Sequence, residues 1–157
     1  SCSLDISETS RIKDMLGLLS LYFDKPLILI NSHLDKQTKH LVCGYALGHY
    51  LEHQLLMDLH TLNKFLTIKD KHILLYEHNA FTSHLMLDSD EVYQMTKRGL
   101  DAAQISAAKR IHLNLVLVKL LELHHLGYDL RHYRAQHHAF IKQFNLPAHF
   151  QFDVAAG

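Results

Sequence analysis

The segment LVCGYALGHYLEH, residues 41–53, decides the fold together with LLYEHNAFTSHLML, residues 74–87. Apolar residues of the first segment recur at three- and four-residue spacing, which is typical of one face of an α-helix. Asp35 or Thr38 can begin this helix, and it should run to about Leu56. The same spacing returns from Glu77 to Leu87 and predicts a second helix. These two helices hold most of the candidate functional residues.

The first helix contains a frame that departs from the zinc-binding motif HExxH. In that motif two histidines one turn apart bind Zn²⁺, and the glutamate beside the first activates a water molecule. Here the frame reads YALGH: His49 stands at the second ligand position, but Tyr45 replaces the first histidine and Ala46 replaces the glutamate. Tyrosine is a poorer zinc ligand than imidazole, and alanine cannot accept a proton from water. The frame therefore predicts a catalytically degenerate site.

A second frame in the same helix keeps both a metal pair and a base. Residues 49–53 read HYLEH, which matches the inverted zincin pattern HxxEH. His49 and His53 are four residues apart, so both can face one metal ion, with Glu52 as the base. Glu77 or His84 of the second helix would complete the ligands. An active HxxEH peptidase therefore stays open as an alternative, as does metal binding without catalysis.

The remaining elements fit one domain with both helices and strands. The short apolar run 27–31 follows Pro26 and predicts a buried strand. Short extended segments are possible within 62–68 and 72–76, and a helix followed by an irregular arm is expected after Gly127. The other expected helices are 6–22, from Ser89 or Asp90 to 97 with Gly99 as its stop, 102–110, and one that Asn114 caps and Gly127 ends.

Composition excludes several classes of function. Sixteen basic and sixteen acidic residues cancel, so no large field favours nucleic acid, a membrane surface or an acidic substrate. No apolar run is long enough to cross a bilayer. Cys2 and Cys43 give no disulfide framework, which favours a reducing cytoplasm. Cys43 is expected to be a buried, inert thiol. Fifteen histidines should make the protein cationic in mild acid.

Residues 104–121 are spaced as in a helix-turn-helix, which raises a DNA-binding hypothesis. The would-be recognition helix is dominated by leucine and valine and leaves only Asn114, Lys119 and Glu122 to contact bases or phosphates. Such a helix is expected to pack against other elements instead. Direct binding of nucleic acid is therefore the weakest of the functional hypotheses.

The chain resembles the ImmA/IrrE family of zinc-peptidase-like proteins over roughly residues 6–130. The resemblance implies an α+β fold, a mainly helical zincin-like domain with a small β-sheet, over residues 1–130. Residues 131–157 would form an arm that packs on this domain or binds a partner. It also assigns His49 as the second zinc histidine and Glu77 as the third ligand. The segments that carry the resemblance are LILINSHL, LGHYLEH, EHNAFTSHLML and DAAQISAAKRIHLNLVLVKLL, in that order.

The same resemblance suggests a biological role. Members occur in phages and mobile elements beside helix-turn-helix repressors, so such a repressor is the expected partner, in the cytoplasm. With Tyr45 and Ala46 in the catalytic frame, the expected activity is antirepression: the protein binds the repressor without cutting it. No cofactor is required for that role, although zinc can bind through His49, His53 and Glu77. The alternatives are a zinc peptidase that uses Glu52 and a DNA-binding regulator.

Overall fold

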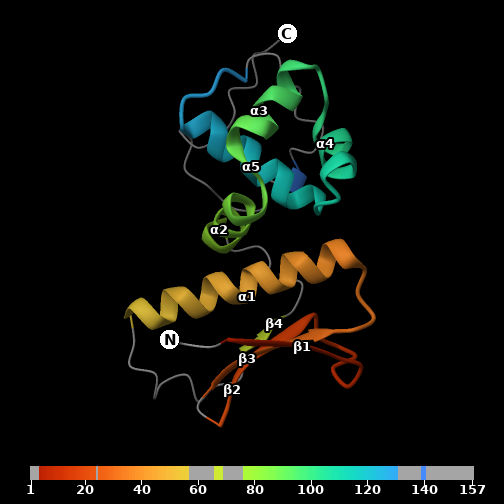
Figure 1. The fold of residues 1–157 in the computed structure, drawn as a ribbon, viewed down its shortest axis with the longest axis vertical. Helices are drawn as coiled ribbons and strands as arrows, with labels where there is room; N and C mark the ends of the chain where they lie inside the picture. Colours follow the sequence, from red (N-terminus) through yellow and green to blue (C-terminus); the bar gives the residue numbers. More distant parts are fainter. Residues whose placement is uncertain (1–3, 24, 57–65, 69–75, 131–138, 141–157) are drawn as a thin grey trace. The chain divides into compact units, whose positions relative to one another are not determined.

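Four short strands form a mixed sheet near the N-terminus (Figure 1). The strands are β1 (Asp5–Thr9), β2 (Gly17–Tyr22), β3 (Lys25–Asn31) and β4 (Leu66–Ile68), and their order is β1-β3-β2-β4. β3 runs parallel to β1 and antiparallel to β2, which in turn pairs antiparallel with β4. The structure is a computed structural model, and it describes residues 4–23, 25–56, 66–68, 76–130 and 139–140.

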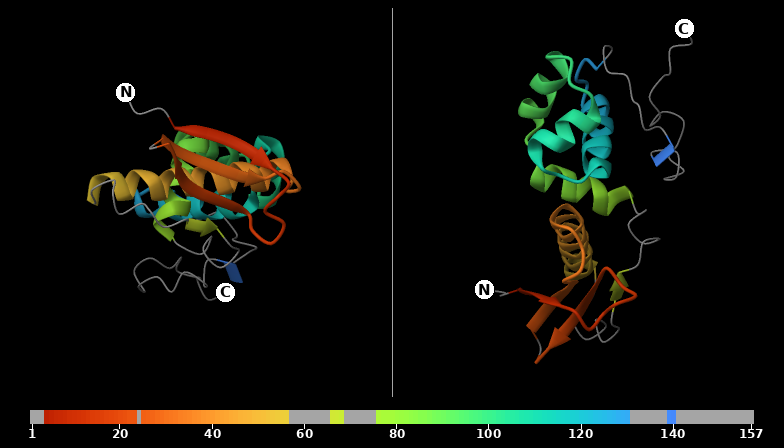
Figure 2. Two further views of the ribbon diagram at one scale, coloured as in Figure 1. Left: turned by 90° about the horizontal axis from the view of Figure 1, so that it is seen from below. Right: turned by 90° about the vertical axis from the view of Figure 1, so that its right-hand side faces the viewer.

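Helix α1 (Lys36–Leu56) lies along one face of this sheet, as Figures 1 and 2 show from three directions. The backbone N–H of Thr38 donates to the Asp35 carboxylate over 3.0 Å, so the predicted start of the helix is confirmed. Because Ile28 and Ile30 are two residues apart in β3, both point to the same face of the sheet, and both are buried. Helix α1 contributes its own buried residues, among them Leu41, Val42 and Tyr45.

The predicted helix over residues 6–22 is wrong. This segment forms β1, a turn and β2. Helical spacing does relate Ile12, Met15, Leu16 and Leu19. The first three lie in or beside the turn, and Leu19 is a buried residue of β2 whose side chain points to the inner face of the sheet. Pairing of both segments with β3 supplies backbone hydrogen bonds that a local period cannot reveal.

Asn31 fixes that turn from the end of β3. Its side-chain amide donates to the backbone carbonyls of Ile12 and Met15, over 3.1 and 2.9 Å, and its side-chain oxygen accepts from the His33 N–H over 3.0 Å. The residue is 5% exposed, so these bonds satisfy a buried amide. The run 27–31, predicted as a strand, is confirmed as part of β3.

The chain divides into two compact units, residues 1–82 and 83–157, and the division falls within α2 (Tyr76–Met86). The second unit also contains α3 (Ser89–Lys97), α4 (Ala102–Lys109) and α5 (Leu113–His125). Its core is built around α5, which packs on α3 and α4 and buries nearly every residue from Leu115 to Leu123. The fold is therefore α+β and mainly helical, as predicted.

Helix ends in the second unit differ slightly from the predicted ones. Asp88, rather than Ser89 or Asp90, caps α3 by accepting from the Glu91 N–H over 2.8 Å. His112, rather than Asn114, caps α5 through its ring Nδ1. Neutral imidazole can accept this bond, but it is not among the common N-cap residues. The helix-turn-helix arrangement of residues 102–125 was nevertheless predicted correctly.

Some predictions fall outside the described residues. These are the extended segments 62–65 and 72–75 and nearly all of the arm 131–157. The described part of 62–68 is β4, which is extended as predicted. Among the described helices, none has the length and apolar character that a membrane crossing requires.

Candidate metal-binding site

Two glycines on α1 allow α2 to approach closely. A Cβ atom built on Gly44 would overlap the Thr82 side chain, closer than real Cβ atoms come to other atoms, and one on Gly48 would lie 3.0 Å from the Phe81 ring. The second position would also lie 3.4 Å from the imidazole of His78. Because the glycines are one turn apart, they leave a smooth strip on α1 for this part of α2. The strip brings His78 against the helix that carries the YALGH frame.

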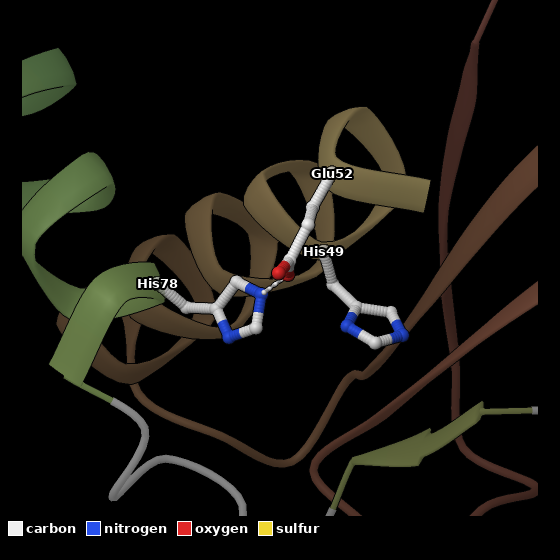
Figure 3. A group of neighbouring side chains, drawn as sticks. All are labelled: His49, Glu52 and His78. Atoms are coloured by element: carbon white, nitrogen blue, oxygen red, sulfur yellow. Dashed lines mark hydrogen bonds and ion pairs between the residues drawn. The ribbon is translucent and has the colours of Figure 1, made fainter. Parts of the chain in front are cut away.

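Three side chains converge where these helices meet (Figure 3). His49 and Glu52 extend from α1 and His78 from α2, and one ligand atom from each lies within 4.8 Å of the others. The His78 Nε2–H donates to Glu52 Oε2 over 2.9 Å, and the rings of His49 and His78 have centroids 5.3 Å apart. The His78 side chain is 8% exposed, whereas that of Glu52 is 52% exposed. The cluster therefore reaches from the interior to solvent.

The ring of His78 contacts two rings of α1. Its centroid lies 4.8 Å from that of Tyr45 and 5.3 Å from that of His49. The bond to Glu52 requires a proton on Nε2, so neutral His78 carries no proton on Nδ1. That nitrogen is buried and has no hydrogen-bond partner among the described residues. A buried, unsatisfied acceptor is costly, so the Nδ1 of His78 lowers the stability of the present arrangement.

The two replaced positions of the HExxH frame are part of the core. Tyr45 is 2% exposed and Ala46 is fully buried. Burial, with a smaller contribution from the negative charge of Glu52, raises the pKa of Tyr45 to about 12. At neutral pH the residue is therefore a neutral phenol. It can neither act as a base nor offer the phenolate that would bind a metal ion.

The donor set of the cluster fits zinc. Two imidazole nitrogens and a carboxylate oxygen are ordinary zinc ligands, and three protein ligands leave one position open in a tetrahedral site. The hydrogen bond between His78 and Glu52 already brings two of the donors together. No other group of three or more His, Cys, Asp or Glu side chains with this proximity occurs among the residues that the structure describes.

The sequence identified two members of this cluster and missed the third. His49 was predicted as a ligand and Glu52 as a base. Glu77, the third ligand that the family resemblance implies, lies exposed in the first turn of α2 and outside the cluster. His78 is the next residue. That it is a histidine, a common zinc ligand, was the one feature of the sequence that could have identified it. The side chain of His53 lies outside the part of the chain that the structure describes.

Two other candidates occupy different surroundings. His84 lies in the second unit, where its Nδ1 is 2.8 Å from Lys119 Nζ and its Nε2 is 3.1 Å from Glu122 Oε2. Cys43 is half-buried, and burial raises the pKa of its thiol, as expected for an unreactive cysteine. In the helix-turn-helix segment, Leu115 to Leu121 of α5 are all buried, which favours packing over contact with DNA.

Comparison with protein families gives a match over most of the chain. A model of the IrrE N-terminal-like domain, a peptidase family, matches residues 8–121, which is more than half of the chain. The matched range contains both α1 and α2, and hence the whole His49, Glu52 and His78 cluster. No curated protein sequence gives a significant match.

Proposed function

This chain belongs to the IrrE N-terminal-like peptidase family, and we propose that it is a catalytically degenerate member that binds a protein partner without cleaving it. The family consists of zinc peptidases, so the domain is metallopeptidase-like. The proposal concerns what this particular chain has kept. It has kept the scaffold and a possible metal-binding cluster, and it has changed the residues that activate water.

The observation that carries the proposal is the burial of Tyr45 and Ala46. A peptidase of the HExxH type needs a carboxylate beside the metal, and position 46 offers a methyl group with no exposed surface. Loss of a general base alone typically lowers the rate about 100- to 10,000-fold. The neutral phenol of Tyr45 removes one ligand from the same frame. Both changes act in the same direction, toward a domain that does not hydrolyse peptides.

The partner that this reading favours is a helix-turn-helix repressor, and the effect is antirepression. The family resemblance supports this partner, since related proteins of phages and mobile elements occur beside such repressors. A protein with a formal net charge of zero has no general attraction for DNA, so the repressor itself is the better target. Binding in the cytoplasm would keep the repressor from its operator.

Zinc would have a structural role here. Held by His49, Glu52 and His78, it would link α1 to α2. In this arrangement Glu52 serves as a ligand. It therefore cannot also be the free carboxylate that a peptidase uses as a base.

Co-purification and gel-shift experiments with the neighbouring repressor test the proposal. The chain should bind the repressor with a Kd of about 1 μM or tighter and release it from its operator DNA. Tyr45→Phe is a suitable control, because it keeps the buried ring and should bind equally well. No binding at micromolar concentration would overturn the proposal.

The rival function is a zinc peptidase that uses the HxxEH frame. Its support is that His49 and Glu52 do lie in one cluster with a further imidazole. It predicts repressor fragments, sensitivity to chelators and inactivation by Glu52→Gln. Intact repressor after long incubation with the chain and added Zn²⁺ would exclude it.

A further inference from the structure

A groove separates β1 from α1 in the first unit. Its cavity has a volume of about 460 Å³, within the range of pockets that bind small molecules. On the sheet side it is lined by Ile6, Glu8 and Ile30. On the helix side it is lined by Lys36, Lys39, His40 and Cys43, which recur at helical spacing.

The groove exists because α1 covers β3 and leaves β1 open. Ile6 is paired with Ile28, and Glu8 with Ile30, so the side chains of each pair point to the same face of the sheet. On that face Ile28 is fully buried, whereas Ile6 is 54% exposed. An isoleucine on the helix-covered face of a sheet is normally buried. The exposure of Ile6 shows that α1 does not cover β1 at this position.

β1 also offers backbone groups at the edge of the sheet. It is the terminal strand in the order β1-β3-β2-β4, and among the described residues it pairs with β3 alone. Four of its five residues are exposed. An edge of this kind can accept an extended segment of another protein as an additional strand.

The charges of the groove favour an acidic occupant. Glu8 already has a partner, since Lys39 Nζ lies 2.6 Å from its carboxylate. Lys36 is exposed, and the structure shows no ion pair for it among the described residues. His40 adds a buried Nδ1 that makes no hydrogen bond within the described part of the chain. A carboxylate entering beside Lys36 would gain a cation as its partner.

Part of the lining is apolar. It consists of Ile6, Ile30 and Cys43, and burial raises the pKa of the Cys43 thiol, which keeps it neutral. The groove thus combines the charge of Lys36 with apolar side chains beside the edge strand β1. That combination suits a side chain on an extended backbone better than a free anion.

We propose that the β1 edge and this groove bind an extended acidic segment of a partner protein, which adds as a strand beside β1 and places a glutamate or aspartate side chain next to Lys36 and His40. The inference rests on the proposed function, because it gives a surface for the partner that the degenerate site does not cut.

Short strand-forming peptides test the proposal on the full chain. The probe is acetyl-Thr-Val-Glu-Val-Thr-amide, and two matched peptides carry Gln or Lys in place of the central Glu. Amide shifts of the ¹⁵N-labelled protein should change saturably along β1 and the first turns of α1. We expect a Kd on the order of 1 mM for the Glu peptide and about fivefold weaker binding of the Gln peptide.

Charge reversal in the protein sharpens the test. Lys36→Glu should weaken binding of the Glu peptide and strengthen that of the Lys peptide, while Lys25→Glu, exposed in the same unit and outside the groove, should change neither. Equal binding of all three peptides, or shifts outside β1 and α1, would overturn the proposal. Sodium acetate that reproduces the shifts in α1, with no response of β1 to any peptide, would overturn it in favour of a simple anion site.

The failure of this inference can be told from failure of the proposed function. The peptide titration contains no repressor, and the co-purification contains no peptide. Repressor binding without peptide binding would refute only the groove. Peptide binding without repressor binding would refute only the proposed partner.

Discussion

The two units each contain a histidine of α2 bonded to a glutamate, and the comparison shows what makes one of them a candidate metal site. His78 Nε2 lies 2.9 Å from Glu52 in the first unit, and His84 Nε2 lies 3.1 Å from Glu122 in the second. The pairs have the same chemistry and similar lengths. They differ in the third group, which is the imidazole of His49 in the first unit and the amine of Lys119 in the second.

That third group decides what each pair can bind. An imidazole adds a neutral donor, so His49, Glu52 and His78 can share a cation. The ammonium group of Lys119 lies 2.8 Å from the remaining nitrogen of His84, and it repels any further cation. A histidine–glutamate pair alone is therefore weak evidence for a metal site. The charge and type of the third side chain beside the pair decide whether a cation can bind.

The largest expected effect separates the two pairs by their zinc affinity. His78→Ala removes a ligand and should weaken zinc binding about 100-fold or more, since loss of even an outer-shell partner costs 10- to 100-fold. His84→Ala is the matched control on the same helix and should leave the affinity unchanged. Competition with a fluorescent zinc chelator measures both. An equal loss of zinc affinity in the two variants would contradict the assignment of the metal site to the His78 pair.

The second effect concerns the packing that delivers His78 to α1. Gly44→Ala would force a methyl group onto the Thr82 side chain, and we expect it to lower the free energy of unfolding by about 2 kcal/mol. Gly48→Ala should cost less, because its methyl group would lie 3.0 Å from a ring that can shift. Urea unfolding measures both variants. A Gly44→Ala protein as stable as the wild type would contradict the close packing.

The third effect tests the buried phenol at the altered zinc position. The pKa of Tyr45 is raised from 10 to about 12, so the folded state holds this proton more tightly than the unfolded state. The resulting stability is fully present below pH 10 and is lost as the pH rises through 12. We expect the loss to be about 1–2 kcal/mol larger in the wild type than in Tyr45→Phe. Tyr22→Phe, an exposed control, should behave as the wild type; identical curves for all three would refute this role of burial.

The smallest effect concerns the lysine of the second unit. Lys119 is 1% exposed, and burial lowers its pKa, against the raising effects of Asp88 and Glu122. Replacing a buried charge with an apolar side chain of similar length is often stabilising, so Lys119→Met should raise the free energy of unfolding by about 1 kcal/mol. Lys97→Met removes an exposed charge and should change little. A large loss of stability in Lys119→Met would contradict this and show that the contact of Lys119 with His84 stabilises the fold by more than the burial of the charge costs.

The sequence predicted the elements that depend on local signals. Asp35 and the apolar spacing of residues 41–53 define α1, and the apolar run 27–31 defines β3. The segment 6–22 failed because its helical spacing is incidental and its partners lie elsewhere in the sheet. A pairing partner is a long-range property that no local window contains.

The same distinction applies to the site. His49 and Glu52 are three residues apart on one helix, so their proximity could be read from the sequence. His78 is 26 residues from Glu52, and it reaches the cluster through the strip formed by Gly44 and Gly48. The family resemblance implies Glu77 as the ligand from α2, but the helix turns His78 toward α1 instead. The orientation of a helix about its own axis depends on tertiary packing, which the sequence does not show directly.

The most direct test of the central claim is incubation of the purified repressor with this protein and Zn²⁺, followed by intact-mass analysis and an operator gel shift on the same sample. The account predicts a repressor of unchanged mass that no longer shifts its operator DNA. Repressor fragments that disappear when Glu52→Gln replaces the wild type would contradict it and show that the chain is an active peptidase.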